Sequence, residues 1–176
     1  MVTTLKKTAS DPPQINSGEK RVAMHQLSWA QYRQVLTALP SSRAARLAYS
    51  QGALEISMPL EDHEQASGLI GLFIRILVME MGLDVKSMWS TTLNREDLDR
   101  GAEPDGAYYI HNHAKVAGKT VDLEIDPPPD LVVEVDITHT DIDKNSLYAA
   151  MGVPEFWRYD GHNWRIYQLD NGQYQE

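Results

Sequence analysis

The segment LVVEVDI, at residues 131–137, constrains the possible folds of this chain more than any other segment. Its first three residues are continuously apolar, a pattern that is typical of a central strand buried on both faces of its sheet. Such a strand needs packed elements on both sides. The composition permits them, because 42% of the 176 residues are hydrophobic, and a chain of this length can bury a sizeable core.

Two short elements and one long helix are predicted before this strand. Ser28 and Gln31 match a capping box and predict a helix over residues 28–39. A hairpin is expected over residues 46–59, because apolar residues alternate on both sides of a Gln-Gly turn. The longest helix is expected over about residues 62–81, and its predicted apolar stripe consists of Ile70, Phe73, Ile74, Leu77 and Met81.

More strands and one further helix are predicted in the second half of the chain. The strand-like runs lie at residues 85–93, 104–110 and 130–138, a helix at 141–151, and a terminal hairpin at 155–170. Together with the first half, they predict an α/β fold. Its core would be a mixed β-sheet flanked by helices, with an N-terminal helix and hairpin.

Charge and composition exclude several classes of protein. The chain has no Cys, so disulfides, thiol nucleophiles and Cys-ligated metals are excluded. The net charge of −9 argues against a protein that coats nucleic acid through charge alone. The longest apolar run, residues 68–81, contains Arg75 and Glu80 and is too short and too charged to span a bilayer. No secretory signal is recognised, so a cytoplasmic location away from membranes is expected.

The sequence predicts a short N-terminal tail followed by one domain. Residues 1–20 are polar and contain Pro-Pro and Asn-Ser-Gly, which predicts a mobile N-terminal tail. Residues 21–176 are then expected to form a single domain.

Asp105, Glu134 and Lys144 form the set of residues that best suits catalysis. Glu134 lies inside the apolar strand, and burying a lone carboxylate is costly. A second carboxylate on a neighbouring strand, Asp105, would raise its pKa further unless a divalent cation lay between them. The ammonium group of Lys144 could orient a water molecule or neutralise a scissile phosphate. The structural alternative is a buried ion pair between Glu134 and Lys144.

These residues lie in a longer pattern that resembles a known family. The segments PDGAYYI and PDLVVEVDITHTDIDKNSLYAAMGVPEFWRYDG resemble the Uma-type family of bacterial endonucleases, which belongs to the restriction-endonuclease-like superfamily with the signature PD-(D/E)xK. The resemblance covers most of residues 20–176 and is more specific in the second half. It implies a restriction-endonuclease-like fold and hydrolysis of DNA with Mg²⁺, for which Mn²⁺ can substitute.

The resemblance also implies roles for individual residues. Asp105 and Glu134 match the metal-binding carboxylates. The signature places Lys two positions after Glu134, where this chain has Asp136 instead, and Lys144 on the following helix would replace that lysine. Asp136 lies on the same strand face as Glu134 and would be an additional metal ligand. Glu64, or His63 beside it, would supply the family's polar residue early in the long helix.

Two functions therefore remain open, together with one question of assembly. The first is a metal-dependent endonuclease acting on DNA. The alternative is a catalytically inactive binding or regulatory module on a nuclease fold, which the absence of Lys at position 136 and the acidic charge favour. Arg43 and Arg46 could meet a phosphate backbone, but the basic residues form no run. The aromatic terminal hairpin also suggests self-association, for example as a homodimer.

Overall fold

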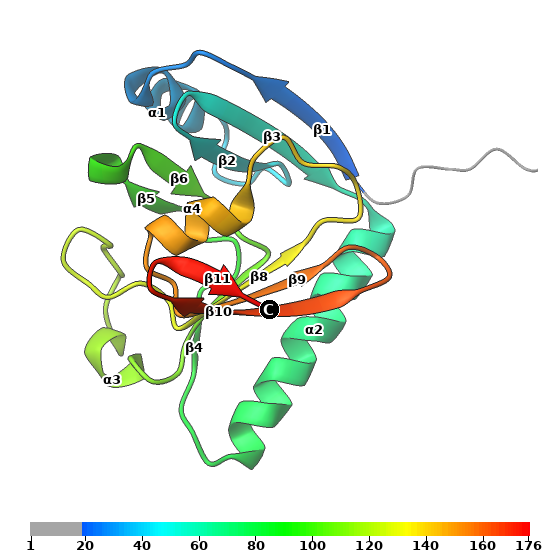
Figure 1. Ribbon diagram of the computed structural model, residues 1–176, viewed down its shortest axis with the longest axis vertical. Coiled ribbons are helices and arrows are strands. Elements are labelled where there is room, and N and C mark those ends of the chain that lie inside the picture. The colour runs from blue at the N-terminus through cyan, green and yellow to red at the C-terminus, as the bar shows by residue number, and fades with distance from the viewer. Residues whose placement is uncertain (1–18) are drawn as a thin grey trace, which may run out of the picture.

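Within residues 19–176, which the computed structural model describes, the chain forms two β-sheets with helices between and outside them (Figure 1). The strand orders are β1-β3-β2-β6-β5 and β11-β10-β9-β8-β7-β4. The predicted α/β architecture, with its N-terminal helix and hairpin, is confirmed. Residues 1–18 of the predicted tail lie outside the described residues. The predicted tail also included Glu19 and Lys20, but these two residues begin β1 and pair with β3.

The five-stranded sheet carries α1 (Trp29–Ala38) on its outer face. Its strands are β1 (Glu19–Met24), β2 (Arg46–Ser50), β3 (Ala53–Pro59), β5 (Leu93–Arg95) and β6 (Arg100–Ala102), with a 3-10 turn η1 (Glu96–Leu98) before β6. Ser28 and Gln31 form the predicted capping box at the start of α1. The helix then packs Tyr32 parallel to Tyr49, with ring centroids 4.8 Å apart.

The six-stranded sheet contains the apolar segment at its centre. Its strands are β4 (Lys86–Ser87), β7 (Gly106–Tyr109), β8 (Leu131–Val135), β9 (Glu155–Tyr159), β10 (Trp164–Asp170) and β11 (Gln173–Gln175). β8 pairs antiparallel with β7 and parallel with β9. A parallel pair requires a crossover connection, and α4 (Lys144–Ala150) lies in it. A short helix, α3 (His113–Val116), follows β7.

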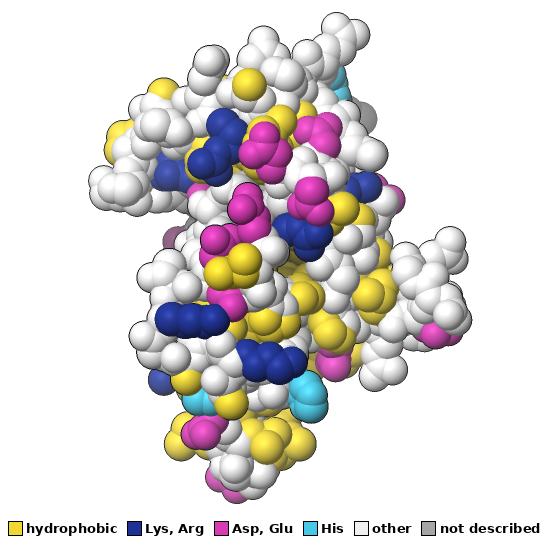
Figure 2. Space-filling model, turned by 90° about the vertical axis from the view of Figure 1, so that its left-hand side faces the viewer, with side chains coloured by type: hydrophobic (Ala, Val, Ile, Leu, Met, Phe, Trp, Pro, Cys, Tyr) yellow, Lys and Arg dark blue, Asp and Glu magenta, His cyan; other side chains and the backbone are white. Residues whose placement is uncertain are grey.

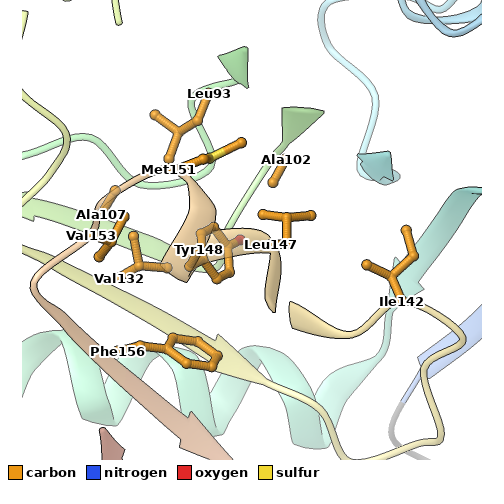
Figure 3. Close-up of a cluster of buried hydrophobic side chains, with 10 residues drawn as sticks. All are labelled: Leu93, Ala102, Ala107, Val132, Ile142, Leu147, Tyr148, Met151, Val153 and Phe156. Carbon is orange, nitrogen blue, oxygen red and sulfur yellow. The ribbon is translucent and has the colours of Figure 1, made fainter. Parts of the chain in front are cut away.

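Both faces of β8 are covered, as the apolar run predicted. Leu131, Val133 and Val135 pack beneath α2 (Glu61–Glu80). The opposite face points toward α4 and the five-stranded sheet. In Figure 3, side chains of α4 and its C-cap lie between those of the two sheets: Leu147, Tyr148 and the C-cap Met151 lie between Val132 and Phe156 on one side and Leu93 and Ala102 on the other. Since Glu134 and Asp136 share this second face, their carboxylates point into the interior.

The apolar stripe of α2 differs from the prediction. Ile70 and Ile74 are buried as expected, and Val78 joins them. Phe73, Leu77 and Met81 are instead 48%, 41% and 62% exposed. The helix is apolar around much of its circumference, so the 3.6-residue period could not identify which face contacts the sheet. Over residues 19–176, no helix combines the length and the apolar content that crossing a membrane would require.

Candidate active site

Strand pairing brings Asp105 beside the central strand. Gly106 of β7 pairs antiparallel with Val133 of β8, so Asp105, one residue earlier, lies opposite Glu134 and close to Val135. The main-chain N–H of Val135 donates to Asp105 Oδ2 over 2.7 Å. Asp105 and Glu134 are both buried, at 5% and 3% exposure. Two of the three residues predicted to carry the chemistry therefore lie side by side: Asp105 immediately precedes β7, and Glu134 lies on the adjacent β8.

Lys144 reaches the same place from the first turn of α4. Its Nζ donates to Glu134 Oε2 over 2.7 Å and to Asp136 Oδ1 over 2.8 Å. Tyr148 lies one turn later and donates its hydroxyl to the other oxygen of Glu134. The Asp143 side chain caps the helix by accepting from the main-chain N–H of Ser146. Asp105, Glu134 and Lys144 line one small buried cavity.

Asp136 lies among cations rather than in a group of metal-binding side chains. Besides Lys144, its Oδ1 accepts from Arg21 over 2.8 Å, and its Oδ2 lies 3.0 Å from Arg158 Nε. The expected three-ligand arrangement of Asp105, Glu134 and Asp136 is not present. In the part of the chain that the structure describes, no group of three or more His, Asp or Glu side chains is arranged to hold a metal ion. The physical reason is that Lys144 lies between Glu134 and Asp136.

Of the two candidates at the start of α2, the structure brings His63 to the cluster and not Glu64. His63 Nε2 lies 3.1 Å from Asp105 Oδ2 and 3.2 Å from Glu19 Oε1. The Glu64 side chain is 57% exposed and contacts Arg46 at 3.3 Å. Adjacent helical positions point about 100° apart, so one side chain faces inward and the other faces solvent.

Arg46 ion-pairs with the oxygen of Asp105 that does not contact His63. Each carboxylate oxygen of Asp105 and of Glu134 therefore has a protein partner. Glu19 Oε1, in contrast, is buried without a hydrogen bond. The donors are the carboxylate oxygens that Mg²⁺ prefers. In the structure, the Arg46 guanidinium neutralises Asp105, and Lys144 lies against Glu134.

Five charged or polar side chains of the cluster were missed by sequence reasoning: Glu19, Arg21, Glu55, Tyr148 and Arg158. Arg21 ion-pairs with Glu19, Glu55 and Asp136 and so links β1, β3 and the end of β8. No local pattern marks β1, whose place depends on pairing with β3. Tyr148 could have been found, because it lies four residues after Lys144 on the same helix face.

Burial and mutual attraction set the protonation of this cluster. Burial raises the pKa of Glu134, and Lys144 opposes that rise. Burial also disfavours charge on Asp136, but Lys144 and Arg21 outweigh it and lower the pKa of Asp136 to about 2. The same carboxylates raise the pKa of Lys144 against the effect of its burial. Burial, with nearby Arg46 and Lys144, lowers the pKa of His63 to about 3, so its imidazole is neutral at pH 7.

An open cleft adjoins the buried cluster at Arg46. Its volume is about 530 Å³, and its lining includes two arginines, two glutamates and four hydroxyl side chains: Arg43, Arg46, Glu64, Glu103, Ser41, Ser90, Thr91 and Thr92. Arg43 ion-pairs with Glu103, which also accepts from Thr92. The face of the molecule in Figure 2 shows Lys and Arg interspersed with Asp and Glu and no continuous basic area.

The mixed sheet carries Glu134 on its central strand and Asp105 just before the adjacent strand, and the crossover helix supplies Lys144. This fold and arrangement place the protein in the restriction-endonuclease-like class. Comparison with known families agrees. The model of the family described as "Uma2: Putative restriction endonuclease" matches residues 29–176, and the chain belongs to this family. A search of curated proteins found no significant match.

Proposed function

We propose that this chain is a metal-dependent endonuclease that hydrolyses phosphodiester bonds of DNA. The family supports a nuclease. The observation that carries the proposal is the position of Lys144, whose ammonium lies 2.7 Å from Glu134 although the chain has Asp136 at the signature's lysine position. A lysine delivered from α4 thus compensates for the departure from the PD-(D/E)xK signature.

Asp105 and Glu134 would hold Mg²⁺, or Mn²⁺ in its place, once Arg46 has moved from Asp105. A bound ion of this kind polarises the scissile phosphate and lowers the pKa of a water molecule. Asp136 is left out of the ligand set, because three cationic side chains already contact it. Its role is to keep Lys144 charged and oriented.

Lys144 and His63 then have distinct roles. The raised pKa of Lys144 keeps its ammonium charged, so it can orient the attacking water and stabilise negative charge that develops on the phosphate. His63 is neutral, and its Nε2–H can donate to Asp105 and fix the orientation of that carboxylate. Support of a metal ligand by a hydrogen-bonded neighbour is common in metal sites.

The substrate backbone would enter through the cleft beside Arg46. Guanidinium and hydroxyl groups are the side chains that usually contact phosphate in nucleic-acid complexes, and the cleft offers Arg43, Arg46 and Thr91 among others. Contact with a phosphate would also draw Arg46 away from Asp105. Substrate entry and metal binding would therefore assist each other.

Plasmid cleavage with the full chain tests this proposal. With Mg²⁺ or Mn²⁺, supercoiled DNA should become nicked or linear, and Glu134→Gln should cut about 100-fold more slowly, as is typical when an essential electrostatic group is removed. Glu124→Gln changes an exposed carboxylate outside the cluster and serves as the matched control. Cleavage by Glu134→Gln at the wild-type rate would disprove the assignment, and so would the absence of cleavage by the wild type with either ion.

A binding or regulatory module without catalysis is the second candidate. It is favoured because every carboxylate oxygen of Asp105 and Glu134 already has a protein partner. The buried cluster is therefore neutralised without a metal ion. Calorimetry with Mn²⁺ separates the two functions. Binding that Asp105→Asn abolishes supports the enzyme, whereas a wild-type protein that binds no Mn²⁺ supports the module.

A further inference from the structure

The carboxylates of the proposed nuclease site lie below the surface of the molecule. Asp105 and Glu134 are 5% and 3% exposed, and the cavity that they line with Lys144 is small. The open cleft of about 530 Å³ adjoins this cavity, because Arg46 and Glu103 line both. A cleft of this size holds one drug-sized molecule, and so it accommodates about one or two nucleotides of a single strand. It has no room for the second strand of a duplex.

The charges of the cleft also suit a duplex poorly. Proteins that hold duplex DNA through its backbone make several contacts from Lys and Arg to the phosphates. Two basic side chains line this cleft, and both are ion-paired, Arg43 with Glu103 and Arg46 with Asp105. The net charge of −9 opposes the approach of a long polyanion. A nucleic acid in the cleft therefore needs other groups besides these cations to hold it.

One wall of the cleft is a tight turn over residues 88–91. The main-chain N–H and the hydroxyl of Thr91 both donate to the carbonyl oxygen of Met88. Met88 anchors the turn, because its own N–H donates to the carbonyl of Ala107 and its side chain packs against the core between the sheets. Ser90 and Thr91 line the cleft. The residue between the anchor and the cleft lining is Trp89, which lies at the tip of the turn.

Trp89 presents an aromatic side chain next to the cleft. It is 46% exposed, and its φ of +47° is uncommon for a bulky residue. A Cβ on Gly71 of α2 would lie 3.5 Å from Trp89 Cζ3 and Cη2, so the six-membered ring of the indole rests against the helix. An indole that is held at one edge and about half exposed can stack on a nucleic-acid base.

The helix α2 aligns the cleft and Trp89. Glu64, which lines the cleft, and Gly71 are seven positions apart, so they lie on the same face of α2 and about 10 Å from each other. The exposed Arg75 lies one turn further along this face. The cleft, the indole and a cation therefore follow one another along the helix. From Glu64 to Arg75 the distance is about 16 Å, the length of about five stacked nucleotides of one strand.

We propose that the site takes unpaired DNA, with a single strand lying along α2 and one of its bases stacked on Trp89. The proposal rests on the nuclease function proposed above. Stacking on aromatic side chains gives single strands much of their affinity and requires no particular sequence. A base in an intact duplex is already stacked between its neighbours and cannot reach Trp89. Arg75 would contact a phosphate beyond the stacked base, and the cleft would lead the scissile phosphate to Asp105.

Fluorescence anisotropy in EDTA tests this binding mode without cleavage. A short labelled single strand should bind the full chain at least about tenfold more tightly than the duplex with its complement. Trp89→Ala should weaken binding of the single strand by about tenfold, and Trp89→Phe, which keeps an aromatic ring, should restore most of it. Trp164→Ala is the matched control, since Trp164 is 41% exposed on β10 and its replacement should leave the affinity unchanged. No binding of the single strand, equal binding of the two DNA forms, or wild-type affinity of Trp89→Ala would overturn the proposal.

Cleavage assays distinguish this proposal from the nuclease function itself. With Mg²⁺ or Mn²⁺, a supercoiled plasmid should be cut at least about tenfold faster than the same plasmid relaxed and closed, because negative supercoiling favours strand separation. Equal cutting of both plasmid forms would overturn the choice of unpaired DNA and leave the nuclease function intact. Binding of the single strand that depends on Trp89, without cleavage of any DNA, would support this binding mode and disprove the nuclease.

Discussion

Lys144 and Glu134 lie ten positions apart in the sequence, yet the lysine Nζ is 2.7 Å from the glutamate Oε2. The contact forms because α4 begins beside the end of β8 and lies against the same face of the sheet. Lys144 is 6% exposed and Glu134 3%. The pair therefore has two functions: it neutralises a carboxylate in the core, and it places an ammonium group at the proposed catalytic site.

Loss of Lys144 should destabilise the fold strongly. Lys144→Met would leave the buried carboxylates of Glu134 and Asp136 without their shared cation. Breaking a buried pair from one side costs about 3–5 kcal/mol, and urea unfolding should show a loss of this size. Lys115→Met removes an exposed lysine and should change the free energy of unfolding by about 0.5 kcal/mol or less. Equal stability of the two variants would show that Lys144 does not neutralise the core carboxylates.

Removal of Arg46 should strengthen metal binding. Its guanidinium neutralises Asp105, so a divalent cation must compete with it. Arg46→Ala should tighten Mn²⁺ binding, followed by electron paramagnetic resonance, by about tenfold, or ~1.4 kcal/mol. Arg33→Ala removes an exposed arginine on α1 and should leave the affinity unchanged. Weaker Mn²⁺ binding by Arg46→Ala would mean that the guanidinium supports the site and does not compete for it.

Much of the fold followed from local patterns. The capping box at Ser28, the 46–59 hairpin and the doubly buried β8 are each determined within a few residues, and all three are present. β1 was missed because its position depends on pairing with β3, and residues 19–24 carry no marked alternation of their own. The buried side of α2 was mistaken because apolar residues surround the helix.

The candidate site likewise contains some residues that local sequence patterns predict and others whose contacts depend on distant parts of the chain. Asp105 and Glu134 could be named from sequence because each lies at a fixed position of the signature, whereas Lys144 was named as the lysine of the following helix in place of one at position 136. Asp136 and Glu64 were given roles from the same pattern, but their surroundings come from distant elements. Arg21, more than 100 positions before Asp136, supplies one of the cations that surround it. Contacts of that separation are set by strand pairing, and local sequence does not reveal them.

The buried His63 should make the metal-free protein less stable in acid. Its pKa of about 3 lies below the 6.5 of an ordinary histidine, so between these values the unfolded chain binds a proton that the folded chain does not. The stabilising contribution is complete above pH 6.5 and falls as the pH decreases toward 3. Urea unfolding in EDTA should show the wild type losing up to about 1.4 kcal/mol per pH unit relative to His63→Gln. Parallel pH profiles would contradict this assignment.

Two glycines should respond oppositely to replacement by alanine, because their surroundings differ. A Cβ on Gly101 of β6 would lie 2.5 Å from the Tyr32 hydroxyl and 2.6 Å from Asn94 Oδ1, two atoms that are themselves hydrogen-bonded over 2.8 Å. Gly101→Ala should therefore separate α1 from the sheet and cost about 1–3 kcal/mol. Gly68 lies in α2 with nothing within 4 Å of a Cβ, so Gly68→Ala should stabilise the helix by about 0.8–1.0 kcal/mol. Thermal melts of both variants would show the opposite shifts, and a neutral Gly101→Ala would mean that Tyr32 can move without loss.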